Sequence, residues 1–251
     1  MINQSIITFE ILKTLQGFIH GFSTREMEGG MSSGPFHNFN LGNFQQDEKT
    51  HIEHNRILFF RQLHINSSCV AYPRQIHSAH VRLIVRPGTY PDCDALITRQ
   101  KKVYLSIQTA DCFPLFLIEP KAGIVALVHA GWRGVLNHIV EHTVGMMTEH
   151  MDADPAKILA AIGPGLQTEC FEVKSDVYRF VPEDFHHPHP TNDKRYIDLA
   201  GFINKKLIAL GLQTGNIEVS DLCTKCRPDL FFSFRRDGIK SGRMMGILGI
   251  C

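Results

Sequence analysis

A cysteine and a histidine stand at the outer ends of two apolar runs near the middle of the chain. Cys112 precedes Phe113–Ile118, and His129 follows Ile124–Val128. Between the runs, Glu119–Gly123 contains Pro and Gly where a turn needs them, so the sequence predicts a β-hairpin. With paired residue numbers summing to about 241, Cys112 is expected directly opposite His129, with Cβ atoms about 5 Å apart. A register error of one residue would turn one of the two side chains to the other face.

A thiol and an imidazole at that separation are consistent with three kinds of site. The histidine can activate the cysteine as a nucleophile. Both side chains can bind one metal ion, since zinc takes sulfur at about 2.3 Å and imidazole nitrogen at about 2.1 Å. The third interpretation is a buried cysteine beside an unrelated histidine. The spacing alone leaves all three open.

The residues after His129 indicate an anion site. Ala130–Gly134 is a glycine-rich turn that leads into a helix, expected over Gly134–Met151 from the spacing of its apolar residues. Free backbone N–H groups and the positive end of the helix dipole attract anions there, and Arg133 adds a two-pronged cation. The alternative is that the glycines only form a tight turn.

Two further polar segments carry weaker indications. His77 follows Arg74 and Gln75 in a mixed segment, and as a lone histidine it fits either the core or the surface. Cys223 and Cys226 form a CxxC pattern, but a zinc site of that type needs a second pair, and the chain contains none. The sequence therefore favours free thiols at these two positions.

Apolar runs and capping residues define the elements that must position these side chains. Further strands are expected at Val103–Ile107, Lys157–Ile162, Ile217–Val219 and Met245–Ile250, and further helices at Ser175–Val181 and Leu199–Leu210. Pro182–Arg195 is predicted to be a surface loop. Phe231–Arg236 is expected to be a strand whose end offers Arg235 to an anion, or a surface edge. Strands covered by helices, with a hairpin among them, indicate an α+β (mixed α/β) domain rather than a purely parallel sheet.

Composition restricts the classes of function. The chain has 251 residues, enough for a sizeable core, and we expect a single domain over residues 1–251. Lys and Arg number 26 against 25 Asp and Glu, so no strong field favours nucleic acid or an anionic membrane. No apolar run is long enough to span a bilayer, and the N-terminus does not resemble a signal peptide. Seven irregularly spaced cysteines favour a reduced, cytoplasmic protein.

Taken together, the motifs resemble the YfiH family, also called laccase-domain or polyphenol oxidase proteins. The resemblance extends over nearly the whole chain, and TADC and HAGWRG are its most specific segments. It is carried by His20–Arg25, Asn40–Gly42, Gln75–His77, Asp94–Thr98, Thr109–Cys112, His129–Gly134, Ile162–Gly165, Cys223–Thr224 and Phe231–Asp237. It implies a four-layer α/β/β/α fold with two mixed sheets, shared with some cysteine hydrolases.

The resemblance also implies a zinc site formed by His77, Cys112 and His129, with copper as the alternative metal. The implied activity is that of a purine nucleoside phosphorylase, in which adenosine or inosine and phosphate yield the base and ribose 1-phosphate. Adenosine deaminase and methylthioadenosine phosphorylase side activities are implied as well. An open zinc position lowers the pKa of water to about 7, which suits deamination at C6 of adenine. Asp94 or Asp111 is then expected to move protons.

Phosphorolysis requires phosphate to be held beside the sugar. Arg133 and the backbone at Gly131 are the first candidates, and Arg25, Asn40 and Arg235 complete the residues expected to bind phosphate or substrate. The expected partners are small purine nucleosides and phosphate, with neither nucleic acid nor a membrane. The expected assembly is a monomer or a homodimer.

Three alternative functions stay open. A copper-dependent, laccase-like polyphenol oxidase is weaker, because a trinuclear copper cluster takes many paired histidines, and the one HxH pattern, His187–His189, lies in a Pro-rich segment. A metal-free hydrolase that uses Cys112 and His129 would keep full activity after chelation. A metal-buffering or partner-binding protein would bind zinc without turning over any nucleoside.

Overall fold

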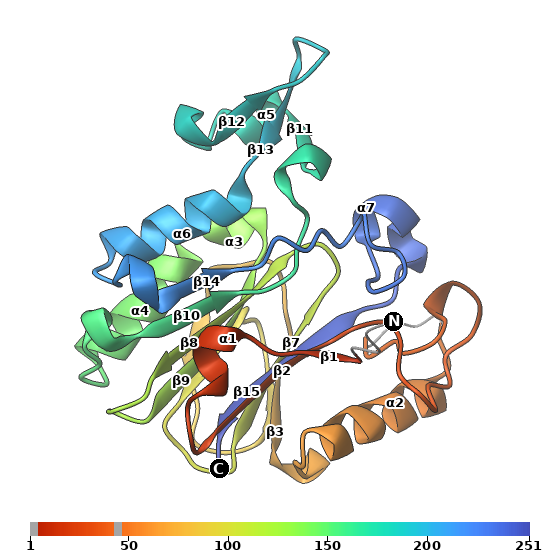
Figure 1. Cartoon of the computed structure of the whole chain (residues 1–251), viewed down its shortest axis with the longest axis vertical. Coiled ribbons are helices and arrows are strands. Elements are labelled where there is room, and N and C mark those ends of the chain that lie inside the picture. Colours follow the sequence, from red (N-terminus) through yellow and green to blue (C-terminus); the bar gives the residue numbers. More distant parts are fainter. Residues whose placement is uncertain (1–4, 43–46) are drawn as a thin grey trace.

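The computed structural model describes residues 5–42 and 47–251, which contain two six-stranded mixed sheets (Figure 1). In spatial order, the first sheet consists of β1 (Ile6–Ile7), β2 (Phe18–Ser23), β15 (Met244–Ile250), β7 (Tyr104–Thr109), β3 (Val70–Pro73) and β5 (Gly88–Tyr90). The second consists of β14 (Ile217–Val219), β10 (Leu159–Ile162), β8 (Phe113–Glu119), β9 (Ile124–Ala130), β6 (Ala95–Thr98) and β4 (Val81–Leu83). The two sheets pack face to face around one buried cluster that draws residues from both.

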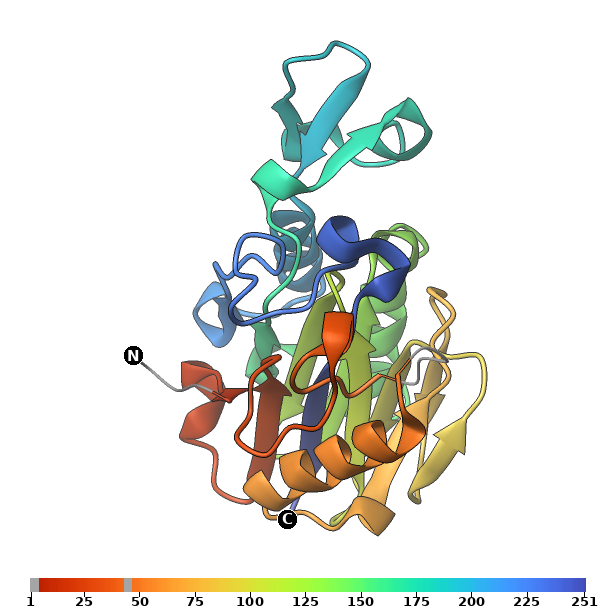
Figure 2. The same cartoon turned by 90° about the vertical axis from the view of Figure 1, so that its right-hand side faces the viewer.

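Helices cover the outer face of each sheet. On the first sheet, Phe59 and Phe60 of α2 (Lys49–Gln62) pack against Met245 and Ile247 of β15. On the second sheet lie α4 (Ile139–Glu149) and α6 (Leu199–Ala209), whose apolar residues share a cluster with β8 and β9 (Figures 1 and 2). The remaining short helices are α1 (Glu10–Lys13), α3 (Trp132–Leu136), α5 (Ser175–Tyr178) and α7 (Phe234–Asp237). The predicted four-layer α/β/β/α fold with mixed sheets is confirmed.

The central hairpin β8–β9 forms as predicted, but its register is not the predicted one. His129 pairs with Pro114, so the prediction that it lies directly opposite Cys112 is wrong by two residues. The reason is a four-residue turn, which lets both strands extend to the pair Glu119 and Ile124. Because side chains alternate along a strand, an even shift keeps the cysteine and the histidine on the same face, toward the other sheet.

The predicted helix over Gly134–Met151 is broken into α3 and α4. The break lies at His138, whose φ of 69° is left-handed and cannot continue an α-helix. The apolar spacing continues across the break, with Val135 in α3 and Ile139 in α4 both fully buried. The helix that begins at Trp132 is therefore only five residues long, and its dipole is much weaker than the sequence predicts.

A small third sheet projects beyond the two large ones (Figure 2). Its order is β11 (Glu172–Lys174), β13 (Lys194–Ile197) and β12 (His186–Pro188). The predicted surface loop over Pro182–Arg195 is thus largely an antiparallel hairpin in which His186 pairs with Ile197. Phe231–Arg236 is not a strand either, because its second half belongs to α7, which the hydroxyl of Ser233 caps.

The remaining predicted elements are confirmed, with small changes at their ends. The strands expected near residues 103, 157, 217 and 245 are β7, β10, β14 and β15. The carboxylate of Asp198 caps α6 by accepting a hydrogen bond from the backbone of Gly201, and α5 ends at Tyr178, before the predicted Val181. Among the described residues, no helix has the length and apolar character needed to cross a bilayer.

Candidate metal centre and cavity

Three potential metal ligands from separate segments meet at one end of the central hairpin. His77 lies in the loop after β3, Cys112 directly before β8, and His129 near the end of β9. One ligand atom from each lies within 4.8 Å of the others, and the two imidazole rings meet edge to face with centroids 4.8 Å apart. The structure therefore brings the thiol and both imidazoles of the predicted set together.

Gly131 allows this close approach. A Cβ atom at this position would stand 2.9 Å from Sγ of Cys112, which is too close for ordinary packing, and 3.4 Å from Cδ2 of His77. The first glycine of HAGWRG is thus needed because a larger residue would collide with the thiol of Cys112. This requirement differs from the predicted role for Gly131, which was to present backbone N–H groups to phosphate.

Asp94 organises two of the three ligands. Its carboxylate is fully buried and accepts hydrogen bonds from the backbone N–H groups of Ile76, His77 and Ser78 at 3.2, 3.0 and 2.7 Å. It also lies 2.8 Å from Nδ1 of His129, which directs the other ring nitrogen toward the ligand cluster. These contacts fit a positioning role better than the predicted proton transfer, because the backbone N–H groups and the His129 ring occupy the carboxylate oxygens.

The cysteine and histidine of the hairpin form a charge pair. Burial acts to raise the pKa of Cys112, but the neighbouring His129 and His77 outweigh it and lower the pKa to about 6. Burial acts to lower the pKa of His129, while Cys112 and Asp94 raise it to about 9. Asp94 in turn has its pKa lowered to about 2, because the hydrogen bond and charge of His129 outweigh its burial.

This donor set fits a metal ion. A thiolate and two imidazoles are the ligands that zinc and copper prefer, and a carboxylate behind a ligating imidazole is the usual outer partner of such sites. Three protein ligands would leave one tetrahedral position for a substrate or water, as in catalytic zinc sites. The residues present can therefore hold the implied metal.

The ligand cluster opens into a cavity of about 1210 Å³, which is large enough for a small organic ligand and an anion together. His77, Cys112 and His129 all border this cavity, together with Trp132 and Phe171. Its lining is rich in cations: Arg56, Arg74, Arg133, Arg235 and Arg243 border it, against the carboxylates of Glu53 and Asp111. The balance of charge favours an anionic ligand.

Asp111 lies in the cavity wall beside the thiol. Its Oδ1 accepts a hydrogen bond from the hydroxyl of Thr224 at 2.7 Å, and its Oδ2 accepts one from the backbone N–H of Arg235 at 2.6 Å. The side chain of Arg235 donates to the carbonyl of Glu172 at 2.8 Å and borders the cavity. Of the two predicted proton-transfer carboxylates, only Asp111 borders the cavity among the described residues.

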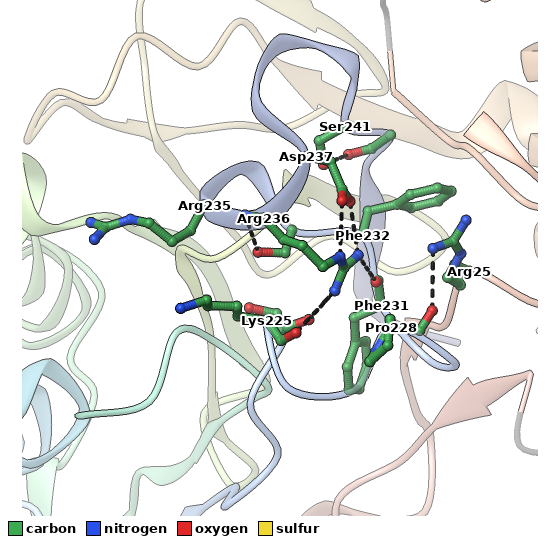
Figure 3. A network of polar contacts seen from close by, with 12 residues as sticks. Arg25, Lys225, Pro228, Phe231, Phe232, Arg235, Arg236, Asp237 and Ser241 are labelled. Carbon is green, nitrogen blue, oxygen red and sulfur yellow. Dashed lines mark hydrogen bonds and ion pairs between the residues drawn. The ribbon is translucent and has the colours of Figure 1, made fainter. Parts of the chain in front are cut away.

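Arg25 is not part of this cavity, contrary to its predicted place in a phosphate clamp. Its guanidinium donates to the carbonyls of His37 and Pro228 and lies 4.6 Å from the ring centroid of Phe232. Figure 3 shows Arg25 and Arg235 extending to opposite sides of Arg236. All three guanidinium nitrogens of Arg25 therefore already donate to backbone carbonyls rather than to a ligand.

Asn40, predicted to bind phosphate or substrate, is not among the residues that border this cavity. Its amide oxygen accepts a hydrogen bond from the backbone N–H of Arg243 at 2.9 Å, and its amide nitrogen donates to Asp47. Arg243 borders the cavity and interacts electrostatically with Cys112 and Asp111. The sequence analysis missed this arginine, because Ser241–Gly242 before it reads only as a turn.

The comparison with known proteins agrees with this architecture. A family model described as multi-copper polyphenol oxidoreductase laccase matches residues 19–251. The chain belongs to this laccase-domain family. The predicted YfiH resemblance is confirmed, because the solved structure of Bacillus licheniformis YfiH matches with a TM-score of 0.92 and 29% identity, over 98% of this chain and 97% of that chain.

Two relatives of this chain carry names from nucleoside chemistry. A purine nucleoside phosphorylase of Bacteroides thetaiotaomicron is 31% identical, covering 97% of this chain and 95% of its own length. Adenosine deaminase RL5, from an unknown prokaryotic organism, is 32% identical, covering 93% of this chain and 94% of its own length. These names support an enzyme that processes nucleosides, while the family description associates the domain with a metal.

Proposed function

We propose that the protein is a zinc-dependent purine nucleoside phosphorylase that converts adenosine or inosine and phosphate to the free base and ribose 1-phosphate. One observation carries the proposal: the ligand set His77, Cys112 and His129 shares a single cavity with five arginines. In this proposal the metal centre stabilises the leaving base, and the cationic wall holds phosphate beside the sugar. The phosphorylase names of the relatives support it.

In this proposal the cationic wall binds phosphate beside the sugar. Arg133, Arg235 and Arg243 supply guanidinium groups with the planar fork that suits phosphate oxygens. Trp132 borders the same space and carries Arg133 against its ring, 4.4 Å from the centroid. The short α3 contributes little dipole, so arginine side chains are the main anion-binding groups.

The reaction exchanges one bond at the sugar. A phosphate oxygen forms a bond to C1′ while the bond from C1′ to the purine nitrogen breaks, and the leaving base takes both electrons and then a proton. A zinc ion held by His77, Cys112 and His129 would supply Lewis acidity at the base end of the cavity. Asp111, held in the wall by Thr224, is placed to hold or pass the proton.

A steady-state assay with inosine and phosphate tests the proposal. The zinc-loaded protein should release hypoxanthine and ribose 1-phosphate in equal amounts, and only when phosphate is present. Cys112→Ala should reduce the rate by at least about 100-fold, because it removes a metal ligand. Cys251→Ala alters an exposed cysteine outside the cavity and should not change it. Absence of product from zinc-loaded wild-type protein would refute the proposal.

Two observations support second candidates. The relative named as an adenosine deaminase, and the place of Asp111 in the same cavity as the three potential metal ligands, favour adenosine deamination by the same site. Cleavage of methylthioadenosine by the same chemistry belongs to this proposal as well. The contact of His129 with Asp94 also matches a Cys–His–Asp triad, and therefore a metal-free hydrolase. Chelation separates these cases, because only the triad would stay active without metal.

The copper-oxidase alternative can be tested on the same preparation. Neither group of potential metal ligands among the described residues contains the paired histidines that a trinuclear copper centre uses. A phenol substrate should therefore not be oxidised by copper-loaded protein faster than by copper alone. A cytoplasmic location and a monomeric or homodimeric state stay predictions, to be measured by cell fractionation and light scattering.

A further inference from the structure

A second group of cysteines converges away from the ligand set that we assign to catalysis. Cys170 lies at the end of a 3-10 turn over Thr168–Cys170, while Cys223 and Cys226 lie between β14 and α7. The three sulfur atoms lie within 4.8 Å of one another, and those of Cys170 and Cys226 are 3.2 Å apart. The CxxC pair, for which the sequence contains no second pair, thus gains a third thiol from a distant part of the chain.

Backbone contacts hold the two cysteine-bearing segments together. Gly165 and Cys223 form a parallel β-bridge, and the N–H of Thr224 donates to the carbonyl of Gly165 at 3.0 Å. The side chain of Gln167 donates to the carbonyl of Ser220 at 3.1 Å. These contacts hold residues 165–167 against residues 220–224, so the fold brings the two cysteine-bearing segments together.

Arg236 supports the CxxC segment from the other side. Its guanidinium donates to the carbonyls of Thr224 and Lys225 at 3.2 and 3.1 Å, and to the carbonyl of Phe231 at 2.9 Å (Figure 3). Asp237 completes the arrangement by accepting two hydrogen bonds from the same side chain. The turn that carries Cys226 is therefore anchored at the two residues before it.

Zinc binding explains this cluster better than a disulfide. A disulfide would use only two of three thiols that meet, whereas zinc takes several thiolates, and CxxC is a common zinc-ligand spacing. With Zn–S bonds of about 2.3 Å, two sulfurs on a tetrahedral ion stand about 3.8 Å apart. This value lies between the 3.2 Å that separates the sulfurs of Cys170 and Cys226 and the 4.8 Å within which all three sulfurs lie. Cys170 and Cys223 are buried and Cys226 is exposed, so the open side of the cluster faces solvent.

We propose that Cys170, Cys223 and Cys226 bind a zinc ion whose fourth position is open to a small exogenous ligand. This site is separate from the centre at His77 and does not depend on the function proposed above. The Cys170 segment also reaches the cavity, because the N–H of Leu166 donates to the carbonyl of Asp111 at 2.8 Å. Zinc at the thiol cluster would therefore stiffen the wall that holds Asp111.

Metal titration in a background without the first site tests the proposal. Cys112→Ser protein, reduced and stripped of metal, should still bind one zinc ion per chain in competition with a chromophoric chelator. Adding Cys226→Ser should weaken that binding by at least about 100-fold, since even the loss of an outer-sphere partner costs 10–100-fold. Adding Cys251→Ser instead should leave the affinity unchanged, because Cys251 is exposed and lies outside the cluster.

A cobalt spectrum supplies a second readout. Cobalt in the Cys112→Ser protein should show the intense sulfur-to-metal charge-transfer bands of several thiolates, and Cys226→Ser should diminish them. Thermal unfolding of each variant checks that it is folded. Failure of Cys112→Ser to bind zinc, an unchanged affinity in Cys226→Ser, or uptake of Cu⁺ but not Zn²⁺ would each overturn the assignment. None of these outcomes depends on whether the protein turns over a nucleoside.

Discussion

At the scale of single residues, Asp94 links two ligands through one carboxylate. Asp94→Asn keeps the shape but removes the charge that orients His129, and it can put an amide N–H where an acceptor is needed. We expect zinc affinity at the first centre to fall about 10–100-fold, as outer-sphere substitutions typically cause. Competition with a chelator measures this loss in Cys226→Ser protein, where the second cluster is disabled. An unchanged affinity would show that the carboxylate does not orient the ligands.

Gly131 offers a purely steric test of the same centre. In Gly131→Ala the new methyl group meets Sγ of Cys112 at 2.9 Å, so the thiol must move. We expect nucleoside turnover and zinc binding at this centre to drop at least about 10-fold, since displacement of about 1 Å can cost more than that. Gly145→Ala in α4, where the nearest neighbour is 3.7 Å away, is the matched control and should keep full activity. Equal activity of both variants would contradict the steric explanation.

The charge pair predicts an unusual pH dependence for Cys112. In metal-free protein its pKa is about 6, compared with an ordinary value of 9, so the thiolate persists at neutral pH. Alkylation of Cys112 by iodoacetamide should therefore be nearly constant from pH 9 to pH 7 and should decline only as the pH falls through about 6. Peptide mass spectrometry gives the rate at this residue. A decline that begins near pH 9, as for a small-molecule thiol, would be inconsistent with the charge pair.

The sequence predicts the chemistry of the centre better than the roles of its neighbours. The hairpin pattern brings Cys112 and His129 to one face, but only the family resemblance adds His77 to them. Arg25 and Asn40 lie in family motifs, yet their partners are carbonyls and amides supplied by distant segments. A motif shows which residues matter and does not show which of them face the cavity.

At the scale of elements, a buried carboxylate closes the central turn. Glu119 is 2% exposed and accepts hydrogen bonds from the backbone N–H groups of Lys121 and Ala122. Glu119→Ala would leave these donors without their partner, and the free energy of unfolding should fall by about 1–3 kcal/mol. Urea unfolding measures this change, and Glu119→Gln, which keeps an acceptor, should lose less. Equal stability of Glu119→Ala and wild type would show that water replaces the carboxylate.

Two differences at this scale have local causes that apolar patterns do not encode. The hairpin register depends on which residues form the turn, and the pattern of the runs fits two registers that differ by two residues. The helix break at His138 depends on one left-handed residue, while Val135 and Ile139 keep the apolar face continuous. In both cases the burial of side chains was predicted correctly, and the backbone path was not.

At the scale of the whole molecule, one aromatic side chain packs in the core between the two sheets. Phe116 of β8 is fully buried, lies 4.9 Å from the ring of Phe9, and fills the space left by Gly246 on the opposite sheet. Phe116→Ala should reduce the free energy of unfolding by about 3–5 kcal/mol in urea titrations. Because the residue joins both sheets, fluorescence and circular dichroism should lose signal together. Separate transitions would mean that the sheets unfold independently.

The large-scale arrangement was the least accessible from patterns alone. Strand and helix signals indicate a mixed α/β domain, but the pairing of two mixed sheets follows from the family resemblance. Strand β15, from the end of the chain, pairs between β2 and β7, and no local signal encodes that placement. No local signal encodes the approach of Cys170 to the CxxC pair either, because this approach depends on the parallel bridge between Gly165 and Cys223.

The three ligands of the first centre come from a loop, a strand end and a second strand, which only the packed sheets bring together. In an unfolded chain the three ligands meet only rarely, because closing the loops between them costs conformational entropy. A metal at this point must therefore bind the native state in preference to any open state, and free metal shifts the folding equilibrium by mass action. The thermal midpoint of this protein should therefore rise with the concentration of free metal in its surroundings.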